Sequence, residues 1–172
     1  LEKKNLKIIR KNVGYVFQDA DSQLFMSTVF DDVAFAPRNY GMSEAEVNEK
    51  TMEALKVVHI EQLKDKQIYK LSGGEKKLAS IATILSTEPD VILMDEPSVA
   101  LDPKNRRNLI NILNQLNQAK IIASHDLNML MDTCERTILL SDGKIIKDGN
   151  TKEILLDKEL MEESGLELPL GY

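Results

Sequence analysis

The sequence predicts an α/β fold: a parallel sheet with crossover helices, an inserted helical segment, and a C-terminal hairpin followed by a helical tail. Three observations predict it. Short apolar runs of strand length alternate with helical patterns in the second half of the chain. A mostly helical stretch from about residue 20 to 78 lies between two predicted strands. Asp142-Gly143 separates two short strand-like segments, and both residues tolerate the positive φ of a tight hairpin turn.

In the N-terminal half, one strand and two helices are marked by local signals. The strand spans residues 13–17 and leads into a polar loop. One helix begins at Ser43, which forms a capping-box pattern with Glu46, so that each side chain satisfies a free backbone N–H. The other helix follows residues 71–74 and carries apolar residues at helical spacing up to Leu85.

The C-terminal half continues the alternation of strands and helices. Residues 91–94 form an unbroken apolar run, which predicts a strand covered on both faces. Asp102, followed by proline, predicts the N-cap of the next helix. A second buried strand is expected at 121–123, a helix near 127–134, and a charged helical tail from residue 151.

Composition limits the classes of protein to which the chain can belong. Its 172 residues are 42% hydrophobic and 29% charged, which is ordinary for a globular domain and excludes full disorder. The net charge of -6 disfavours nucleic acid as a partner, because such binding depends on basic patches. The single cysteine, Cys134, excludes an internal disulfide framework. No apolar run approaches the roughly 18 residues of a membrane span.

An acidic pair, Asp95-Glu96, directly follows the strand at 91–94. This places both carboxylates at the carboxyl edge of the sheet, where α/β proteins bind ligands. Neighbouring residues of an extended chain point in different directions, so one carboxylate can hold Mg²⁺ while the other faces a water molecule. For this segment alone, a solvated acidic loop is the alternative.

Three other segments have the residue types of a phosphate site. In residues 71–75, two glycines and a hydroxyl stand at a helix start, whose free N–H groups attract anions. An ordinary N-cap is the alternative there. His125 follows a predicted strand and can donate to a phosphate oxygen, although a plain loop histidine has the same surroundings. Gln18 also follows a strand, where an amide can orient water or complete a metal shell.

The order of these segments along the chain resembles the nucleotide-binding subunit of ABC transporters, over residues 13 to about 150. The resemblance implies part of a P-loop NTPase (RecA-like) core with an inserted helical subdomain. The expected segments are 1–19 for the end of the core, 20–78 for the helical subdomain, 79–150 for the rest of the core with the hairpin, and 151–172 for the tail.

The resemblance also implies roles in ATP hydrolysis. Gln18 matches the Q-loop glutamine, which reaches toward Mg²⁺ and the attacking water. Asp95 matches the Walker B aspartate that holds Mg²⁺, and Glu96 matches the catalytic glutamate that positions or activates water. His125 matches the switch histidine that contacts the γ-phosphate. These roles agree with phosphoryl transfer in general, in which catalysis is positioning and charge stabilisation.

The remaining matches imply a second ATPase subunit, in a homodimer or a heterodimer. Ser72, Gly73, Gly74 and Glu75 match the signature motif, which caps the γ-phosphate of ATP bound by the opposite subunit. Glu75 stands where the family most often has glutamine. Asp102 ends the segment that matches the D-loop, which crosses the dimer interface.

Residues 16–25 and 28–37 resemble the cobalt/nickel and energy-coupling-factor branch of this family, whose members energise uptake of metal ions or vitamins. The implied partners are transmembrane transporter subunits that bind the Q-loop and helical surface, at the cytoplasmic face of the membrane. All four phenylalanines lie between residues 17 and 35. They are expected either to form part of that docking surface or to form the core of the helical insertion.

One departure from the family pattern is large: the sequence contains no G-x-x-x-x-G-K-[ST] motif. The expectation is that the chain is the C-terminal portion of an ATPase, with its phosphate loop before Leu1, and is inactive alone. A non-catalytic interaction module is the first alternative. A soluble ABC ATPase of DNA repair or translation is the second, and the phenylalanine-rich segment and the absence of a long heptad insertion argue against it.

Overall fold

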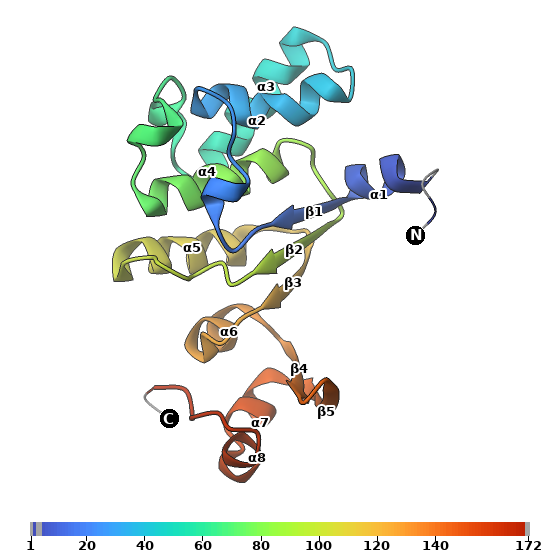
Figure 1. Ribbon diagram of the computed structural model, residues 1–172, viewed down its shortest axis with the longest axis vertical. Coiled ribbons are helices and arrows are strands. Elements are labelled where there is room, and N and C mark those ends of the chain that lie inside the picture. The colour runs from blue at the N-terminus through green and yellow to red at the C-terminus, as the bar shows by residue number, and fades with distance from the viewer. Residues whose placement is uncertain (1, 3–4, 171–172) are drawn as a thin grey trace. The chain divides into compact units, whose positions relative to one another are not determined.

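The computed structural model describes residue 2 and residues 5–170, and the chain divides into two compact units, Leu1–Ala123 and Ser124–Tyr172. Figure 1 labels their helices and strands. The elements of the first unit are α1 (Leu6–Asn12), β1 (Val13–Val16), the 3₁₀ turn η2 (Ala20–Ser22), α2 (Val29–Asn39), α3 (Glu44–Val57), the 3₁₀ turns η3 (Glu61–Leu63) and η4 (Ile68–Lys70), α4 (Gly73–Leu85), β2 (Val91–Asp95), α5 (Pro103–Gln115) and β3 (Ala119–Ala123).

The sheet of the first unit is parallel, in the order β1-β2-β3, which confirms the predicted fold class. Helix α4 packs on β1 at Gly14, where a Cβ atom would lie only 2.0 Å from the Cγ2 atom of Ile84. A glycine is therefore required at this point of the strand, because any side chain would push the helix off the sheet.

One face of this sheet is buried and the other is largely open, which corrects the prediction of strands covered on both faces. Ile92 and Met94 are buried, whereas Tyr15 is 43% exposed, and Ile121, in register with it through Leu93, is 63% exposed. The apolar runs at 91–94 and 121–123 marked the strands correctly. An unbroken apolar run nevertheless does not indicate which face of the strand packs against the rest of the protein.

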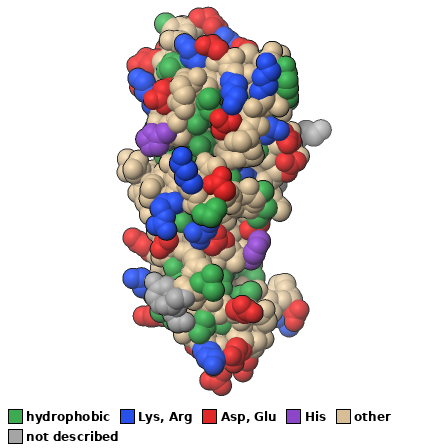
Figure 2. Space-filling model, turned by 90° about the vertical axis from the view of Figure 1, so that its left-hand side faces the viewer, with side chains coloured by type: hydrophobic (Ala, Val, Ile, Leu, Met, Phe, Trp, Pro, Cys, Tyr) green, Lys and Arg blue, Asp and Glu red, His purple; other side chains and the backbone are tan. Residues whose placement is uncertain are grey.

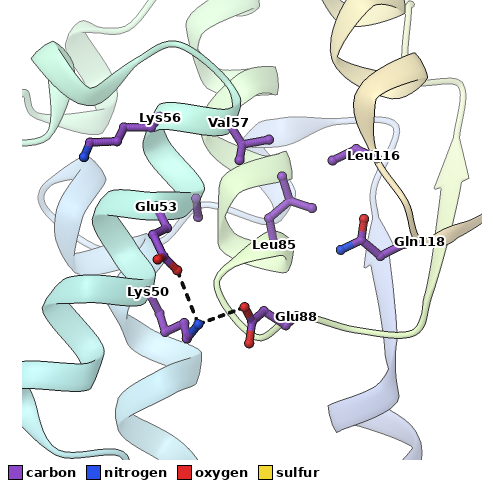
Figure 3. A pocket seen from close by; sticks show the side chains of 9 residues that line it. Lys50, Glu53, Lys56, Val57, Leu85, Glu88, Leu116 and Gln118 are labelled. Atoms are coloured by element: carbon purple, nitrogen blue, oxygen red, sulfur yellow. Dashed lines mark hydrogen bonds and ion pairs between the residues drawn. The ribbon is translucent and has the colours of Figure 1, made fainter.

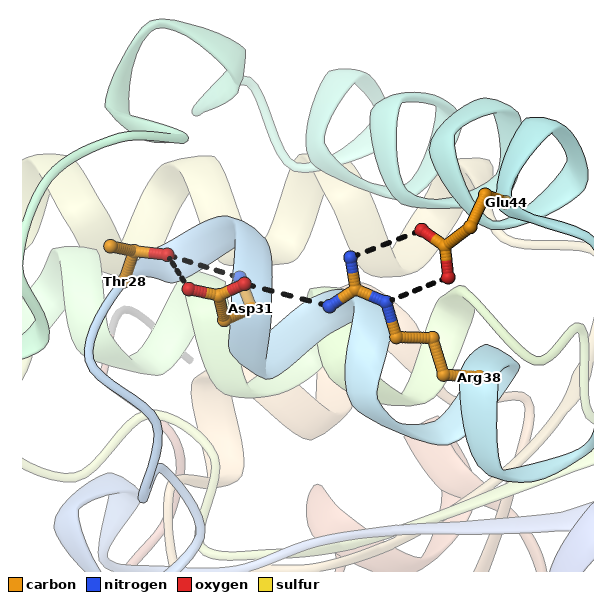
Figure 4. Close-up of polar contacts among 4 residues, drawn as sticks. All are labelled: Thr28, Asp31, Arg38 and Glu44. Atoms are coloured by element: carbon orange, nitrogen blue, oxygen red, sulfur yellow. Dashed lines mark hydrogen bonds and ion pairs between the residues drawn. The ribbon is translucent and has the colours of Figure 1, made fainter.

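Helices α2, α3 and α4 contact one another and form the helical part of the unit (Figure 1). The sequence analysis did not single out α2, which contains Pro37. Thr28 is its N-cap and accepts a hydrogen bond from the Asp31 N–H at 3.2 Å. Figure 4 shows that Arg38 at the end of α2 reaches both Asp31, at 3.5 Å, and Glu44 in the first turn of α3, at 3.2 Å. The Arg38–Glu44 pair thus links the end of α2 to the first turn of α3.

The predicted capping box at the start of α3 is confirmed. The Ser43 N–H donates to Oε2 of Glu46 at 2.8 Å, and the Glu46 N–H donates to Oγ of Ser43. Farther along α3, Thr51 occupies a place on the apolar face and is fully buried. Its hydroxyl has no hydrogen-bond partner in the described part of the chain.

The second unit contains α6 (Leu127–Thr133), β4 (Arg136–Ser141), β5 (Lys144–Asn150), α7 (Thr151–Leu155) and α8 (Lys158–Glu163). Strands β4 and β5 form the predicted antiparallel hairpin, and its turn residues Asp142 and Gly143 have φ of 48° and 72°. Helix α7 contacts both strands, α6 and α8. Among the described residues, no helix has the length and apolar character needed to cross a bilayer.

We predict that Thr51→Val stabilises the protein, because it removes a buried hydroxyl that forms no hydrogen bond and keeps a branched side chain of similar shape. The free energy of unfolding should rise by about 1 kcal/mol, measured by chemical denaturation. Thr83→Val is the matched control, since the Thr83 hydroxyl bonds both Gln23 and the Ser80 carbonyl, and its loss should destabilise. A Thr51→Val protein less stable than wild type would contradict the prediction.

Candidate functional site

Gln18 and the acidic pair Asp95-Glu96 are brought to one edge of the sheet by strand pairing. Val16 at the end of β1 is paired with Met94 of β2, in parallel. Because both strands run in the same direction, the residues that follow them lie at their common carboxyl edge. The sequence predicted that each of these segments directly follows a strand, and the shared role at Mg²⁺ and water was implied by the family resemblance.

The backbone at Glu96 is in a conformation that non-glycine residues seldom adopt, with φ of 43°. Its N–H donates to the Ala123 carbonyl at the end of β3, at 2.8 Å. Ala100 has a φ of 62° in the same connection between β2 and α5. Such conformations cost about 1–3 kcal/mol each and persist where the surroundings enforce them, often at functional sites.

The helix start at residues 72–75 is a capping box, which the sequence analysis missed although the S-x-x-E spacing was there to find. The Ser72 N–H donates to Oε2 of Glu75 at 2.7 Å, and the Glu75 N–H donates to Oγ of Ser72 at 3.3 Å. Glu75 also forms an ion pair with Lys66 at 3.0 Å. The hydrogen bond from the Ser72 N–H is the first cause of a lowered pKa at Glu75. This carboxylate therefore holds the helix start in place.

The two glycines of this segment differ in their surroundings. A Cβ atom built at Gly73 meets no atom within 4 Å, so the backbone there is open to a ligand. Within the described part of the chain, the N–H groups of Gly73 and Gly74 have no recorded acceptor. Two free donors at the start of a helix are suited to an anion such as a phosphate group.

Gly74 links the glycine segment to Asp102. A Cβ atom at Gly74 would lie 2.5 Å from Nδ2 of Asn105, so the α4 backbone packs directly on the Asn105 side chain. Asn105 in turn donates from its N–H and its Nδ2 to the two carboxylate oxygens of Asp102, at 2.9 and 2.7 Å. Asp102 is thus the N-cap of α5, as predicted, and these bonds lower its pKa, that from the Asn105 N–H most. The starts of α4 and α5 are held against each other.

His125, the remaining predicted site residue, belongs to the second unit. It is exposed directly before α6, and its carbonyl accepts a hydrogen bond from the Leu127 N–H at 3.1 Å.

Lys77 is a residue of this region that the sequence analysis did not select. Its side chain is buried, and its Nζ donates to the carbonyls of Phe17 and Gln18, at 2.9 and 2.7 Å. Burial lowers the pKa of Lys77, while the charges of Asp19 and Asp95 act in the opposite direction. The sequence carries no signal for this burial, because a lysine on the same helix could equally extend its ammonium group into water.

A separate cavity of about 390 Å³ lies among α3, the end of α4 and the segment after α5. Figure 3 shows its apolar wall, Val57, Leu85 and Leu116, and the charged edge where Lys50 bonds Glu53 and Glu88. None of the predicted site residues lines this cavity.

The residues at the sheet edge suit Mg²⁺, whose ligands include water and phosphate oxygens, better than a metal ion that is coordinated only by protein side chains. Among the described residues, no three His, Cys, Asp or Glu side chains come together as a metal cage. Mg²⁺ needs only one or two carboxylates when phosphate oxygens and water complete its shell. Asp95 supplies one such carboxylate, and Gln18 follows the neighbouring strand at the same edge of the sheet.

A parallel sheet with an amide and an acidic pair at one edge, beside a glycine-started helix, defines an α/β nucleotide-binding domain. A family model described as ABC transporter matches residues 1–99. The chain belongs to the ABC transporter family, in its ATP-binding branch: it is 49% identical over 163 residues to a putative ABC transporter ATP-binding protein of Geobacter sulfurreducens, covering 95% of this chain and 66% of that protein.

Two further comparisons agree. The energy-coupling factor transporter ATP-binding protein EcfA of Carboxydothermus hydrogenoformans is 40% identical over 99% of this chain and 64% of its own length. The solved structure of cbiO1 from Clostridium perfringens, described as part of the ABC transporter complex cbiONQ, has a TM-score of 0.84 and 36% identity over 94% of this chain and 66% of that one. The chain therefore spans about two thirds of the length of these relatives.

We predict that Gly74→Ala and Gly73→Ala differ sharply in stability. The new methyl group at residue 74 must displace the Asn105 side chain and with it the bond from Nδ2 to Asp102, which should cost about 1–3 kcal/mol of unfolding free energy. At residue 73 the methyl group meets nothing, so stability should be unchanged or slightly higher. Thermal and chemical denaturation of both variants test this, and equal stabilities would refute the packing of Gly74 on Asn105.

Proposed function

We propose that the chain is part of the ATP-binding and ATP-hydrolysing subunit of an ABC importer for cobalt or nickel ions or a vitamin. The observation that carries the proposal is the placement of Gln18 and Asp95-Glu96 at the adjoining carboxyl ends of parallel strands. The importer class and its substrates are supported by the similarity to EcfA and cbiO1.

Each residue has a part in the proposed chemistry. Asp95 and Gln18 would hold Mg²⁺, which neutralises charge on the phosphate oxygens of ATP when it is bound. Glu96 orients the water that attacks the γ-phosphorus in line with the departing ADP oxygen, and its carboxylate accepts a hydrogen bond from that water. His125 donates to a γ-phosphate oxygen, where negative charge is stabilised in the transition state.

The proposal includes a second ATPase subunit. Ser72 and Gly73 are exposed, and with Gly74 they would cap the γ-phosphate of ATP bound by that subunit. Asp102, also exposed, would lie at the interface between the two subunits. ATP between the subunits would hold them closed, and its hydrolysis would let them separate.

We predict that Glu96→Gln in the full-length protein retains ATP binding and loses turnover, because an amide keeps the size of the side chain but is a far weaker base. The loss in kcat should be about 100-fold or more, measured as phosphate release with Mg-ATP, while nucleotide binding is followed separately. Glu88→Gln is the control, since Glu88 is exposed and pairs with Lys50 away from the site. Undiminished hydrolysis by Glu96→Gln would refute the assigned role.

The proposed membrane partner has a candidate docking surface just after the Gln18 loop. Phe25 and Phe35 stack edge to face at 4.7 Å between ring centroids, and they are 64% and 40% exposed. Asp32, buried beneath them, accepts the N–H groups of Phe25 and Met26, each at 3.1 Å. Burial raises the pKa of Asp32, and the two hydrogen bonds oppose that change. The pair thus forms a fixed apolar surface suited to a helix of a transmembrane subunit.

The net charge of -6 disfavours nucleic acid as a further partner. On the face in Figure 2, basic and acidic side chains are interspersed rather than gathered by sign. The proposed location is the cytoplasmic face of the membrane, as a peripheral subunit.

We predict that Phe25→Ala weakens association with the transmembrane subunits while ATP hydrolysis by the isolated protein stays within about 2-fold, because interface aromatics carry much of the binding energy. Copurification of the coexpressed complex, followed by titration with the membrane subunit, measures the loss. Tyr69→Ala is the control, since Tyr69 is exposed and its described side-chain contacts are local, a hydrogen bond to Gln67 and the Lys70 ammonium over its ring. Equal copurification of both variants would rule out this docking surface.

A further inference from the structure

A buried positive charge in α4 bonds the main chain at Gln18. Lys77 is 3% exposed, it is the one buried lysine or arginine in the described part of the chain, and it forms no short ion pair there. An ammonium group removed from water in this way is costly unless its donors are satisfied. The acceptors are two consecutive carbonyls, those of Phe17 and Gln18.

These two carbonyls lie at the point where the chain leaves the sheet. Strand β1 ends at Val16, so the direction of Phe17 and Gln18 is no longer fixed by strand pairing. Lys77 holds both carbonyls on one side. Oε1 of Gln23 accepts the Phe17 N–H at 3.0 Å, while Nε2 of Gln23 donates to the Ser80 carbonyl of α4 at 2.7 Å. Helix α4 therefore replaces the neighbouring strand as the support for this segment.

The same charge acts on the other predicted magnesium ligand. Lys77 and Asp95 attract each other electrostatically, and Asp19 adds a second negative charge on the loop side. The Lys77 ammonium group thus bonds the backbone carbonyl of Gln18 and attracts the negative charge of Asp95. Lys77 also lies one helical turn beyond Gly74, so any shift of the start of α4 moves the donor that holds Gln18.

We propose that Lys77 is a positioning residue that sets the orientation of Gln18 at the magnesium and water site and couples it to the glycine segment at the start of α4. The inference rests on the proposed ATPase function. Removal of the ammonium group leaves the carbonyls of Phe17 and Gln18 without this donor. The backbone from which the Gln18 side chain extends is then no longer held in one position. A displacement of about 1 Å at a reacting centre can lower a rate by about 100-fold.

The test is a double-mutant cycle in the full-length protein with Mg-ATP, built from Lys77→Met, Gln18→Ala and the combination of both. If Lys77 acts through Gln18, Lys77→Met alone should lower kcat by about 10- to 100-fold and raise the Mg²⁺ concentration for half-maximal rate. It should lower kcat no further once Gln18 is alanine, because interacting residues are not additive. Lys77→Arg, which keeps two N–H donors and the charge, should recover most of the rate.

Lys76→Met is the matched control, one residue earlier on the same helix. Lys76 is partly exposed and pairs with the exposed Asp21, and pairs open to water contribute little. Its kcat should stay within about 2-fold of wild type. If Lys77→Met does not fold, Lys77→Gln replaces it in the cycle, since it keeps a donor without the charge.

Hydrogen exchange of residues 17–23 provides a readout that does not depend on activity. Lys77→Met should exchange faster at residues 17 and 18 and the residues that follow, whereas Lys76→Met, which loses only the pair with Asp21, should change exchange at most near residue 21. The proposal would be overturned if Lys77→Met lowered kcat by the same factor whether residue 18 is glutamine or alanine. Unchanged hydrogen exchange of residues 17–23 in Lys77→Met would also overturn it. A wild-type protein that does not hydrolyse ATP would instead refute the proposed function, and the exchange comparison would still decide whether Lys77 holds the Gln18 segment.

Discussion

The parallel pairing of β1 with β2 is the constraint on which the candidate site depends. It fixes Val16 beside Met94, so that the segments following β1 and β2 both leave the sheet at the same edge. No local interaction can bring Gln18 and Asp95 together, because 76 residues lie between them in the sequence. The pairing of the two strands is what joins these distant segments. A slip of one residue would turn Asp95 to the opposite face of the sheet.

Helix α4 is the second element that the site requires, since it contacts β1, the turn η2 and both other helices of the helical part. Its start holds the glycine segment, its second turn carries Lys77, and its last turn packs on Gly14. The hydrogen bonds from Lys77, and that between Gln23 and the Ser80 carbonyl, join the helix to the loop after β1, where strand pairing has ended. Apolar packing thus sets the distance of the helix from the sheet, and hydrogen bonds set the direction of the loop.

What the sequence could predict was local, and what it missed depends on contacts between distant segments. The cap at Ser43, the cap at Asp102 and the Asp142-Gly143 turn each satisfy backbone groups within a few residues, so their pattern suffices. The open face of the sheet around Ile121 and the buried environment of Lys77 have no such pattern. A lysine in a helical stripe looks the same in sequence whether its ammonium reaches water or two carbonyls.

The two linkages on α4 have different physical characters, and this bears on how the site would respond to a nucleotide. Gly74 meets Asn105 by close packing, which resists compression strongly but attracts only through weak, non-directional dispersion. Lys77 meets the Gln18 segment by charge-assisted hydrogen bonds, which attract and are directional. A ligand that pulled the start of α4 away from α5 would therefore meet little resistance at Gly74, while the Gln18 segment would be drawn along by Lys77. Motion of the glycine segment in one direction would be transmitted to the magnesium site.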